Sequence, residues 1–288
     1  LVTQQTDCHV GRVTELLEFK GIKVNKVGVP ADWDKPVAFE YYVESLKKML
    51  TEVEEITGKK VDWDLAKVYF DKSNKINELF RKLNELRKRD NPPIGFSEII
   101  RLEHYSFMVD ADIMIEKLTK LYEELVNAPG KFEEGAPRIL VAGRAFAIGD
   151  YTVPRLIEES GGVIVAELMD EGIRAIEKDV ELEGDLLRNF AKNRYLDKTP
   201  INLFQPSWRI RYERIKELIE EYKVDGVIWY QLAFDEIYDM EYACLAKWMS
   251  DSKVNITKFE TSYEYSRESM GPLTTRIESY VESLKEKK

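Results

Sequence analysis

The sequence has few of the residues that build disulfide or zinc scaffolds. Among its 288 residues are two cysteines, Cys8 and Cys244, and two histidines, His9 and His104. So few cysteines exclude a secreted protein held together by several disulfides, and they make the cytoplasm the expected compartment. Neither histidine belongs to an HExxH motif or has a second histidine nearby. A zinc site and a Ser-His-Asp triad therefore have no support.

Long apolar runs and an excess of positive charge are also missing. No run of about 18 apolar residues occurs, so we expect no membrane-spanning helix. Acidic residues number 53 against 43 lysines and arginines, which gives a net charge of −10. This charge argues against a coat for DNA or RNA, because phosphate binding needs a positive field. No secretory signal is visible. The chain begins at Leu1 rather than Met, and we expect further residues upstream.

Apolar residues make up 44% of the chain, and their spacing predicts three parts. Residues 1–35 show a strand, a helix and a second strand, as in a β-α-β step. Residues 36–128 have apolar residues every three or four positions, which predicts a run of amphipathic helices. We interpret the charges at 81–90 as the solvated face of one of these helices. Residues 136–288 form the third part.

In the third part, apolar strands alternate with helices. The expected strands lie at 139–143, 163–168, 227–231 and 255–260, with a further short strand at 202–205, and the expected helices at 152–160, 208–222, 237–249 and 273–284. Continuous apolar strands separated by helices indicate a parallel sheet covered on both faces. The predicted fold class is therefore α/β: two doubly wound parallel-sheet domains, the first incomplete at the N-terminus, with a helical layer between them.

The loops that follow these strands are the first candidates for a site, because ligands bind an open parallel sheet beyond the carboxyl ends of its strands. The loop 143–150 contains Gly143, Arg144, Gly149 and Asp150. Glycines let a backbone approach a ligand, and N–H groups at a helix start favour an anion. The loop matches neither GxGxxG nor the Walker motif, and a plain strand-to-helix turn explains it equally well.

Two later loops carry polar residues. One holds an acidic cluster, Asp235, Glu236 and Asp239. Clustered carboxylates can hold a cation or act as an acid/base pair. A helix start, where acidic side chains meet the positive end of the helix dipole, is the favoured interpretation. The other loop, 261–272, is polar and long enough to bind a ligand, and it contains Tyr263 and Arg267.

The two cysteines differ in their expected positions. Cys8 falls where the first strand ends and a helix begins, and the positive end of a helix lowers the pKa of a thiol. Cys8 is therefore well placed for a metal ligand, although an inert small residue is also common at such a position. Cys244 falls in the middle of the helix expected at 237–249, where core packing is the favoured interpretation.

Five segments resemble, in their order and spacing, the iron-sulfur subunits shared by 2-hydroxyacyl-CoA dehydratases and ATP-dependent benzoyl-CoA reductases. They are TDCHVGRVTELLE, ITGKKVDWDLAKVYFDKSNKINELFRKLNELRKRDNPP, RILVAGRAFAIGDYTVPRLIEESGGVIVAELMDEGIR, RIKELIEEYKVDGVIWYQLAFDEIYDMEYACL and ETSYEYSRESMGPLTTRIESYVE. The first looks like the strand-end cysteine segment of that family, the second like its helical middle, and the others like its second α/β domain.

The resemblance implies a cofactor and partners. A subunit of this kind pairs with a homologous partner subunit, commonly as a heterodimer, and holds a [4Fe-4S] cluster on cysteine thiolates between two α/β domains. A separate ATP-hydrolysing iron-sulfur activator supplies a low-potential electron. The acyl-CoA substrate then becomes a ketyl-type radical anion. Dehydratases lose the hydroxyl group from it, and reductases add electrons and protons to the ring.

The family pattern carries over to a few positions. Cys8 matches the first visible cluster cysteine, and His9 stands where the family usually has Asp. Asp235, after Phe234, stands where the family has a later cysteine, and the remaining cysteine would lie upstream of Leu1. The metal ligands implied are therefore Cys8 and Asp235. Three alternatives stay open: a cluster with an unusual Asp ligand, a cluster-poor partner subunit, and a subunit without the cluster.

The function implied is that of a subunit of an oxygen-sensitive, ATP-activated radical enzyme. We expect benzoyl-CoA-reductase-like activity, because of the segment EEITGKKVDWD and the missing cysteine. A 2-hydroxyacyl-CoA dehydratase subunit and a non-catalytic structural subunit are the alternatives. A two-lobed binding protein of periplasmic type fits the architecture, but the absent signal segment disfavours it. The residues expected to bind the acyl-CoA are Gly143, Arg144, Gly149, Asp150, Tyr263 and Arg267.

Overall fold

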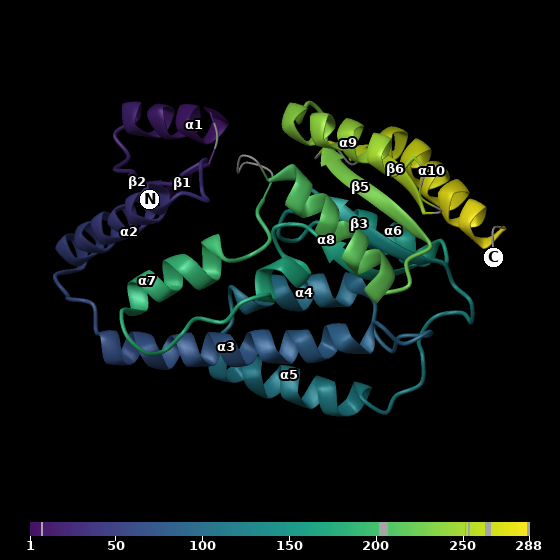
Figure 1. Cartoon of the computed structure of the whole chain (residues 1–288), viewed down its shortest axis with the longest axis horizontal. Helices are drawn as coiled ribbons and strands as arrows, with labels where there is room; N and C mark the ends of the chain where they lie inside the picture. Colours follow the sequence, from purple (N-terminus) through teal and green to yellow (C-terminus); the bar gives the residue numbers. More distant parts are fainter. Residues whose placement is uncertain (7, 202–206, 251, 253, 263–265, 287–288) are drawn as a thin grey trace. The chain divides into compact units, whose positions relative to one another are not determined.

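The computed structural model describes residues 1–6, 8–201, 207–250, 252, 254–262 and 266–286. The chain divides into two compact units (Figure 1), of which the first comprises 1–74 with 178–209 and the second 75–177 with 210–288. The division at 74/75 falls inside one long helix, α3 (Trp63–Leu86). The ranges 1–35, 36–128 and 136–288 were drawn from sequence pattern rather than from contacts, and they stay a prediction.

The first unit starts with the predicted strand, helix and strand. Its elements are β1 (Val2–Gln5), α1 (Cys8–Phe19), β2 (Asn25–Gly28), α2 (Pro36–Thr57), the first half of α3, α7 (Leu186–Ala191) and a π-helical turn (Lys192–Leu196). Within its described part, β1 and β2 pair in parallel, from Val2 opposite Asn25 to Gln5 opposite Gly28. The core of the unit lies between β2, α2 and α7, and is formed by Val27, Tyr42, Val43, Leu46 and Ala191.

The helix α2 shows why the chain folds as its pattern predicts. Pro36 occupies the first helical position, where its missing N–H costs nothing. The helix ends at Gly58, which has φ 67° and donates its N–H to the carbonyl oxygen of Glu54 at 2.8 Å. Between these ends, one face of the helix is buried against the core, and it carries Ala38, Tyr42, Val43 and Leu46.

Among the described residues of the second unit, four parallel strands form one sheet in the order β4-β3-β5-β6. The strands are β3 (Arg138–Gly143), β4 (Val163–Leu168), β5 (Gly226–Leu232) and β6 (Asn255–Thr261). The helices are α4 (Phe96–Ser106), α5 (Ala111–Leu125), α6 (Thr152–Glu159), α8 (Trp208–Glu221), α9 (Glu236–Trp248) and α10 (Arg267–Lys285), with a 3-10 turn at Gly172–Ile176.

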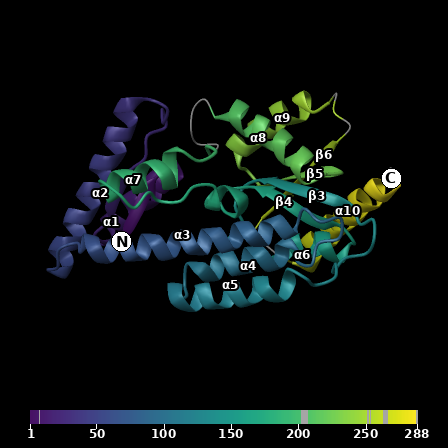
Figure 2. The ribbon, with the colours of Figure 1, turned by 60° about the horizontal axis from the view of Figure 1, so that its bottom comes forward.

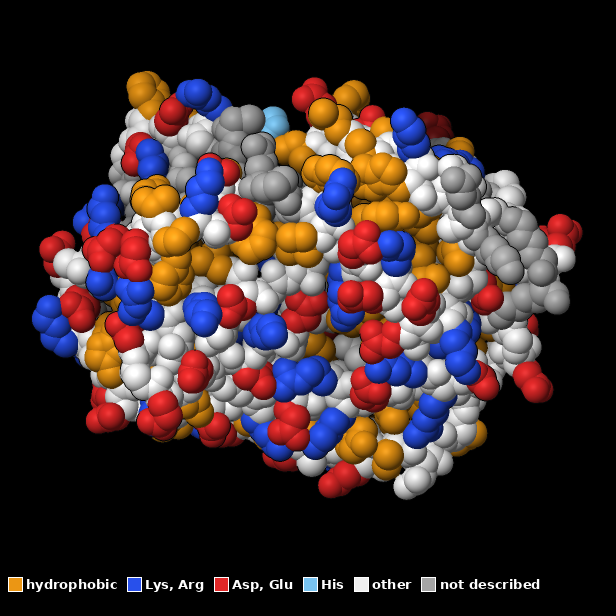
Figure 3. Space-filling model, in the orientation of Figure 1, with side chains coloured by type: hydrophobic (Ala, Val, Ile, Leu, Met, Phe, Trp, Pro, Cys, Tyr) orange, Lys and Arg blue, Asp and Glu red, His pale blue; other side chains and the backbone are white. Residues whose placement is uncertain are grey.

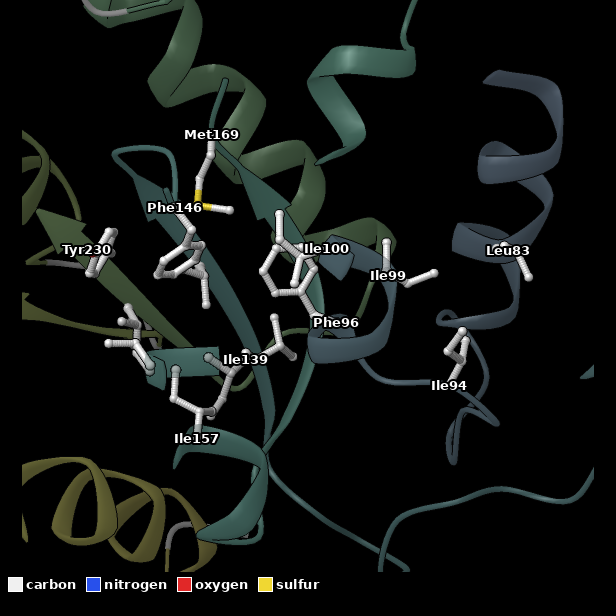
Figure 4. Packing of buried hydrophobic residues seen from close by; sticks show 14 of the residues in the cluster. Leu83, Ile94, Phe96, Ile99, Ile100, Ile139, Phe146, Ile157, Met169 and Tyr230 are labelled. Carbon is white, nitrogen blue, oxygen red and sulfur yellow. The ribbon is translucent and has the colours of Figure 1, made fainter. Parts of the chain in front are cut away.

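Successive residues of each strand point to opposite faces of this sheet, and both faces are covered. On one face, Ile139 and Val141 belong to a cluster with residues of α4, α6 and α10, part of which Figure 4 shows. On the other face, Leu140 and Ala142 belong to a cluster with residues of α8 and α9. A parallel sheet that is wound on both faces confirms the predicted α/β fold class.

A layer of helices continues the first of these clusters. The second half of α3 contributes Leu79 and Leu83, α4 contributes Ile99, and α5 contributes Met114 and Leu118. Figures 1 and 2 both draw α4 and α5 beside this part of α3. The amphipathic helices predicted within 36–128 are present as α2 to α5, and the apolar stripe of this layer packs toward the sheet of the second unit.

Two expectations about the range 136–288 have other outcomes. The prediction of a long polar loop at 261–272 is wrong, because α10 already begins at Arg267 and includes Pro272. Ser266 caps this helix by accepting a hydrogen bond from the Ser269 N–H at 3.3 Å, and a proline in the second turn removes one backbone hydrogen bond without ending the helix.

The strand expected at 202–205 lies outside the described residues. In the part of the chain that the structure describes, no helix is long and apolar enough to cross a membrane.

Candidate functional site

All four strands of the second unit run in the same direction, so their carboxyl ends meet at one edge of the sheet. In an open parallel sheet this edge is where ligands bind. The chain segments that leave the edge begin at Arg144 after β3, at Met169 after β4, at Ala233 after β5 and at Ser262 after β6. These segments contain most of the predicted binding residues.

The segment after β3 is held close to β5. Gly143 has φ 116°, and a Cβ atom at this position would lie 2.2 Å from the carbonyl oxygen of Tyr230. Only glycine fits there, because every other residue would overlap the neighbouring backbone. The Arg144 N–H donates to the same Tyr230 oxygen at 2.9 Å. Phe146 packs on the Tyr230 ring (Figure 4), and the two ring centroids are 4.3 Å apart.

Arg144 and Asp235, predicted for different roles, are brought together. The guanidinium of Arg144 forms an ion pair and hydrogen bond with the Asp235 carboxylate, and it lies over the ring of Tyr238 at 5.7 Å. The Arg144 side chain is 39% exposed and that of Asp235 is 17% exposed. This pair ties the segment after β3 to the segment after β5, and it leaves part of a cationic group at the surface of the edge.

The other residues predicted to bind substrate have different surroundings. Gly149 and Asp150 lie just before α6, where the Asp150 carboxylate accepts from the Thr152 N–H at 3.3 Å. The N–H groups of Arg144, Phe146 and Asp150 already donate to protein oxygens. These three amides are therefore not available to cradle an anion. Tyr263 and the side chain of Arg267 lie outside the described part of the chain.

The segment after β4 rests on a buried ion pair that the sequence analysis missed. Arg87 and Glu167 are both fully buried, and an Arg87 Nη atom lies 2.5 Å from a carboxylate oxygen of Glu167. Arg87 also donates to the Asn84 side chain at 2.7 Å, and Glu167 accepts from the Ile173 N–H at 3.0 Å. The interpretation of the charges at 81–90 as a solvated face is therefore wrong for Arg87. The signal was Glu167 itself, an isolated charge in an otherwise apolar strand.

Two more buried carboxyl groups fix the same turn. Glu103 accepts from the Gly172 N–H at 3.0 Å. Glu171 accepts from the Phe146 N–H at 2.7 Å, and so joins the segments that follow β4 and β3. Gly172 has φ 73°, and a Cβ on it would lie 2.5 Å from the Glu167 side chain, which makes glycine necessary at the centre of the turn.

Burial sets the protonation of these carboxyl groups. It raises the pKa of Glu171 to about 7. Burial, with repulsion from the charges of Glu167 and Glu171, raises the pKa of Glu103 well above its usual range. Burial therefore favours the protonated form of Glu103, while the charge of Glu167 is balanced by Arg87. Together the three carboxyl groups hold the two segments in place.

A small cavity of about 230 Å³ opens at the ends of β5 and β6. Its described lining consists of Ala233, Glu260, Thr261, Ser262, Ser269, Met270 and Leu273. Tyr230 and Thr261 share a hydrogen bond of 3.1 Å between their hydroxyl groups behind this wall. The neighbouring residue Phe234 is 99% exposed with φ 65°. A bulky residue held exposed in the left-handed region marks a strained position.

The acidic cluster after β5 starts a helix, as the favoured interpretation predicted. Asp235 is the N-cap residue of α9, and Glu236 and Asp239 lie in its first turn. Asp239 forms an ion pair with Lys258 at 2.5 Å. Among the described residues, no group of three or more His, Cys, Asp or Glu side chains could hold a metal ion.

The fit of an iron-sulfur cluster depends on thiolates, which this edge lacks among its described residues. Cys8 begins α1 directly after β1, the strand-end position that was expected, but it belongs to the first unit and its side chain is not described. Cys244 is exposed on α9, so core packing is the wrong interpretation; the buried residues of this helix are Tyr238 and Leu245. Asp235 offers an oxygen that Arg144 already holds. The described residues of the edge do not fit a thiolate-bound cluster.

Comparisons with known proteins agree with the resemblance read from the sequence. A protein of Escherichia coli (strain K12) named "Putative dehydratase subunit YjiM" is 26% identical over 292 residues, which span 99% of this chain and 74% of that protein. The family described as 2-hydroxyglutaryl-CoA dehydratase, D-component, matches residues 1–284. This match takes in both compact units and all the elements described above. The chain therefore belongs to the 2-hydroxyglutaryl-CoA dehydratase D-component family.

Proposed function

We propose that this chain is a subunit of a 2-hydroxyacyl-CoA dehydratase-type enzyme and that the carboxyl edge of its sheet binds the acyl end of the thioester. The family match supports a dehydratase component. The observation that carries the proposal is the cavity of about 230 Å³ at this edge. One of its lining residues, Ala233, lies two positions before Asp235, the partner of Arg144. Ligand binding at the carboxyl ends of parallel strands is the general rule for such sheets.

The chemistry of the cavity suits a short hydroxylated acyl chain. Thr261, Ser262 and Ser269 contribute hydroxyl-bearing side chains to a wall that Met270 and Leu273 complete with apolar surface. Pockets for drug-sized ligands usually have volumes of about 300–1,000 Å³. A cavity of about 230 Å³ therefore holds an acyl group, and the rest of the CoA extends outside it.

Arg144 and Phe234 have separate roles in this proposal. The exposed part of the Arg144 guanidinium donates to the thioester carbonyl oxygen, where charge develops when an electron or electron pair is added. The Asp235 carboxylate fixes the direction of that guanidinium. Phe234 covers the apolar part of the ligand and keeps water from it, which explains why its ring is held outward.

Glu260 in the cavity wall points to an uncharged acyl group. Its carboxylate accepts from the Gln231 side chain at 3.1 Å and lies 3.9 Å from the Lys258 ammonium. A free carboxylate at the far end of the acyl chain would lie close to the negative charge of Glu260 and be repelled by it. We therefore propose a 2-hydroxyacyl-CoA with an apolar chain as the substrate, in preference to one with a carboxylate at its far end.

Benzoyl-CoA-reductase-like activity is the second candidate. The observation in its favour is Asp235 at the position where the resemblance expects a cysteine, which sets this chain apart from the usual ligand pattern. The two candidates differ in product. Anaerobic turnover of a 2-hydroxyacyl-CoA gives an enoyl-CoA, whereas turnover of benzoyl-CoA gives a reduced ring, and chromatography of the thioesters separates them.

The proposal includes a homologous partner subunit, an ATP-hydrolysing iron-sulfur activator and a [4Fe-4S] cluster to which this chain contributes the Cys8 thiolate. Iron and sulfide analysis of the anaerobically purified complex tests the cluster. If Cys8→Ala lowers iron content and turnover, this chain shares in the cluster. Unchanged iron and turnover favour the alternative in which the chain is a structural subunit that shapes the site of its partner.

The substrate site is tested by calorimetric titration with a 2-hydroxyacyl-CoA of apolar chain. Arg144→Ala is expected to weaken binding at least tenfold, because the thioester oxygen loses its charged donor. Arg155→Ala on α6, an exposed arginine whose neighbour is Glu159, is the matched control and is expected to leave the Kd unchanged. Equal binding by the Arg144 variant would move the substrate away from this edge.

A further inference from the structure

A second and larger cavity, of about 710 Å³, lies in the first unit. It is a groove bounded by α2, by the start of α3 and by the turn 182–187 that leads into α7. None of its lining residues belongs to the carboxyl edge described above. Its volume falls in the range of ligand-binding pockets, and neither the family match nor the proposed acyl-CoA site accounts for it.

The floor of this groove is apolar. Five aliphatic side chains and one indole line it, namely Leu50, Val61, Leu182, Leu186, Leu187 and Trp63. Trp63 is 41% exposed. On the face drawn in Figure 3, hydrophobic side chains lie among acidic and basic ones over α2 and α7. A partly exposed tryptophan beside leucines is typical of surfaces that bind another molecule.

The charged residues around this floor are mostly acidic. Among the described lining residues, four carboxylates stand against two lysines: Glu54, Asp64, Glu183 and Asp185 against Lys47 and Lys67. Both lysines already have acidic partners, because Lys67 pairs with Glu183 at 2.8 Å and Lys47 pairs with Glu44 at 2.7 Å. Glu54 pairs with Lys60, whose side chain is almost fully exposed. Glu54 and Glu183 are thus neutralised by lysines, and Asp64 and Asp185 leave the groove with a modest negative charge, which favours a cation over a phosphate.

The acidic turn is held rigidly before any ligand arrives. Asn74 forms two hydrogen bonds with the backbone of Val180, at 2.7 and 2.8 Å. The Asn189 side chain donates to the carbonyl oxygens of Glu181 and Glu183 at 2.8 and 2.7 Å. At the end of the turn, the Asp185 carboxylate caps α7. These contacts fix the turn that forms one wall of the groove.

We propose that this groove binds a basic amphipathic segment of another protein. A lysine or arginine of that segment lies against the Trp63 indole and near the carboxylates of Asp64 and Asp185. Apolar side chains of the same segment cover the leucine floor. The negative charge of the groove disfavours the CoA phosphates, so this surface serves protein association rather than substrate binding.

Titration with a defined peptide tests the proposal. The probe is a 14-residue amphipathic peptide of leucine and lysine, compared with the same peptide in which glutamate replaces lysine, and with free spermine. We expect a micromolar Kd for the lysine peptide that weakens at least threefold between 50 and 300 mM salt, with no binding of the glutamate peptide. Equal binding of both peptides, or tighter binding of spermine than of the lysine peptide, overturns the proposal.

Variants place the binding in the groove. Trp63→Ala and the pair Asp64→Asn with Asp185→Asn are each expected to weaken binding of the lysine peptide at least fivefold, and asparagine can still cap α7. The pair Glu159→Gln with Glu213→Gln, which removes two exposed carboxylates of the second unit, is the matched control and is expected to have no effect. Binding that survives both groove variants contradicts the assignment. Acyl-CoA binding is expected to be the same in the groove variants, so failure here leaves the proposed function untouched.

Discussion

The carboxylate of Glu171 accepts a hydrogen bond of 2.7 Å from the backbone N–H of Phe146, and this bond joins the segment after β4 to the segment after β3. Phe146 in turn packs on Tyr230 of β5. One buried acidic group thus positions a segment that carries Arg144, the proposed donor to the substrate. The energetic cost of burying that group makes it a sensitive point of the fold.

Glu171→Gln is expected to change how stability depends on pH. Burial raises the pKa of Glu171 from 4.5 to about 7, with Asp170 and Glu167 adding repulsion. The folded protein thus binds this proton more tightly than the unfolded chain, and its free energy of unfolding falls as pH rises from about 4.5 to about 7. Glutamine keeps an oxygen for the Phe146 N–H but does not titrate. The variant should exceed the parent by less than about 1 kcal/mol at pH 5 and by at most about 3 kcal/mol near pH 8.

Urea titrations at pH 5, 6, 7 and 8 measure this difference. Glu159→Gln on the exposed side of α6 is the control, and its stability relative to the parent should be the same at every pH. A Glu171→Gln difference that is equally independent of pH would show that the carboxyl group is charged throughout, contrary to its buried position.

Arg87→Met is expected to destabilise the protein by about 3–5 kcal/mol, because it leaves the fully buried carboxylate of Glu167 without its partner. Adding Glu167→Gln should recover part of the loss, since the second change removes the uncompensated charge. Arg155→Met, on the surface of α6, should cost less than about 0.5 kcal/mol. Urea denaturation of the three variants checks this, and a double variant no more stable than Arg87→Met would argue against the ion pair as the cause.

Two glycines offer a matched pair of alanine substitutions. Gly143→Ala places a Cβ 2.2 Å from the Tyr230 oxygen at a φ of 116°, so we expect a loss of at least about 2 kcal/mol. Gly271 lies inside α10, and a Cβ there meets no atom within 4 Å other than those of its chain neighbours. The gain in helix propensity from alanine is offset by the ring of Pro272, which disfavours helical backbone for a preceding residue with a Cβ, so Gly271→Ala should change the stability by less than about 1 kcal/mol. Thermal and urea unfolding of both variants measures the contrast, and losses of equal size would contradict the structure at one of the two positions.

Much of the fold could be predicted from hydrophobic pattern. The strand expected at 139–143 is Arg138–Gly143, the strand expected at 163–168 is Val163–Leu168, and the helix before Gly58 ends there. Each of these elements depends on residues that are close together in the sequence, and the residues at its ends stop it through their own backbone conformation. The predicted start of the last helix was wrong, because Gly271 and Pro272 resemble a helix break. The helix α10 nevertheless begins before them and includes Pro272.

The candidate site could be predicted only in part, because its contacts join residues far apart in the chain. The position of Arg144 at the end of a strand follows from pattern, but its pairing with Asp235, 91 residues later, does not. Arg87 could not be told from the other charges at 81–90, because its burial is decided by where α3 meets β4. Cys244 lies one position from the buried Leu245, a difference that helical periodicity alone does not resolve.

Phe234→Gly is expected to separate backbone strain from ligand binding. Phe234 has φ 65° and its side chain is 99% exposed, so the ring contributes little packing while the backbone conformation costs about 1–2 kcal/mol for a residue with a Cβ. Glycine adopts this conformation readily, although it makes the unfolded chain more flexible. The free energy of unfolding should therefore stay the same or rise by up to about 1 kcal/mol, whereas removal of a buried aromatic ring would lower it by several.

The same variant should bind the apolar 2-hydroxyacyl-CoA at least threefold more weakly, because the ring that covers the ligand is gone. Phe234→Leu is the companion variant: it keeps an apolar side chain and the same backbone strain, and should lie between the parent and Phe234→Gly in affinity. Calorimetric titration gives the Kd, and urea unfolding gives the stability of each protein. If glycine left the Kd unchanged, the outward ring would serve something other than the acyl-CoA; if it lowered stability by more than about 2 kcal/mol, Phe234 would have to pack against the protein.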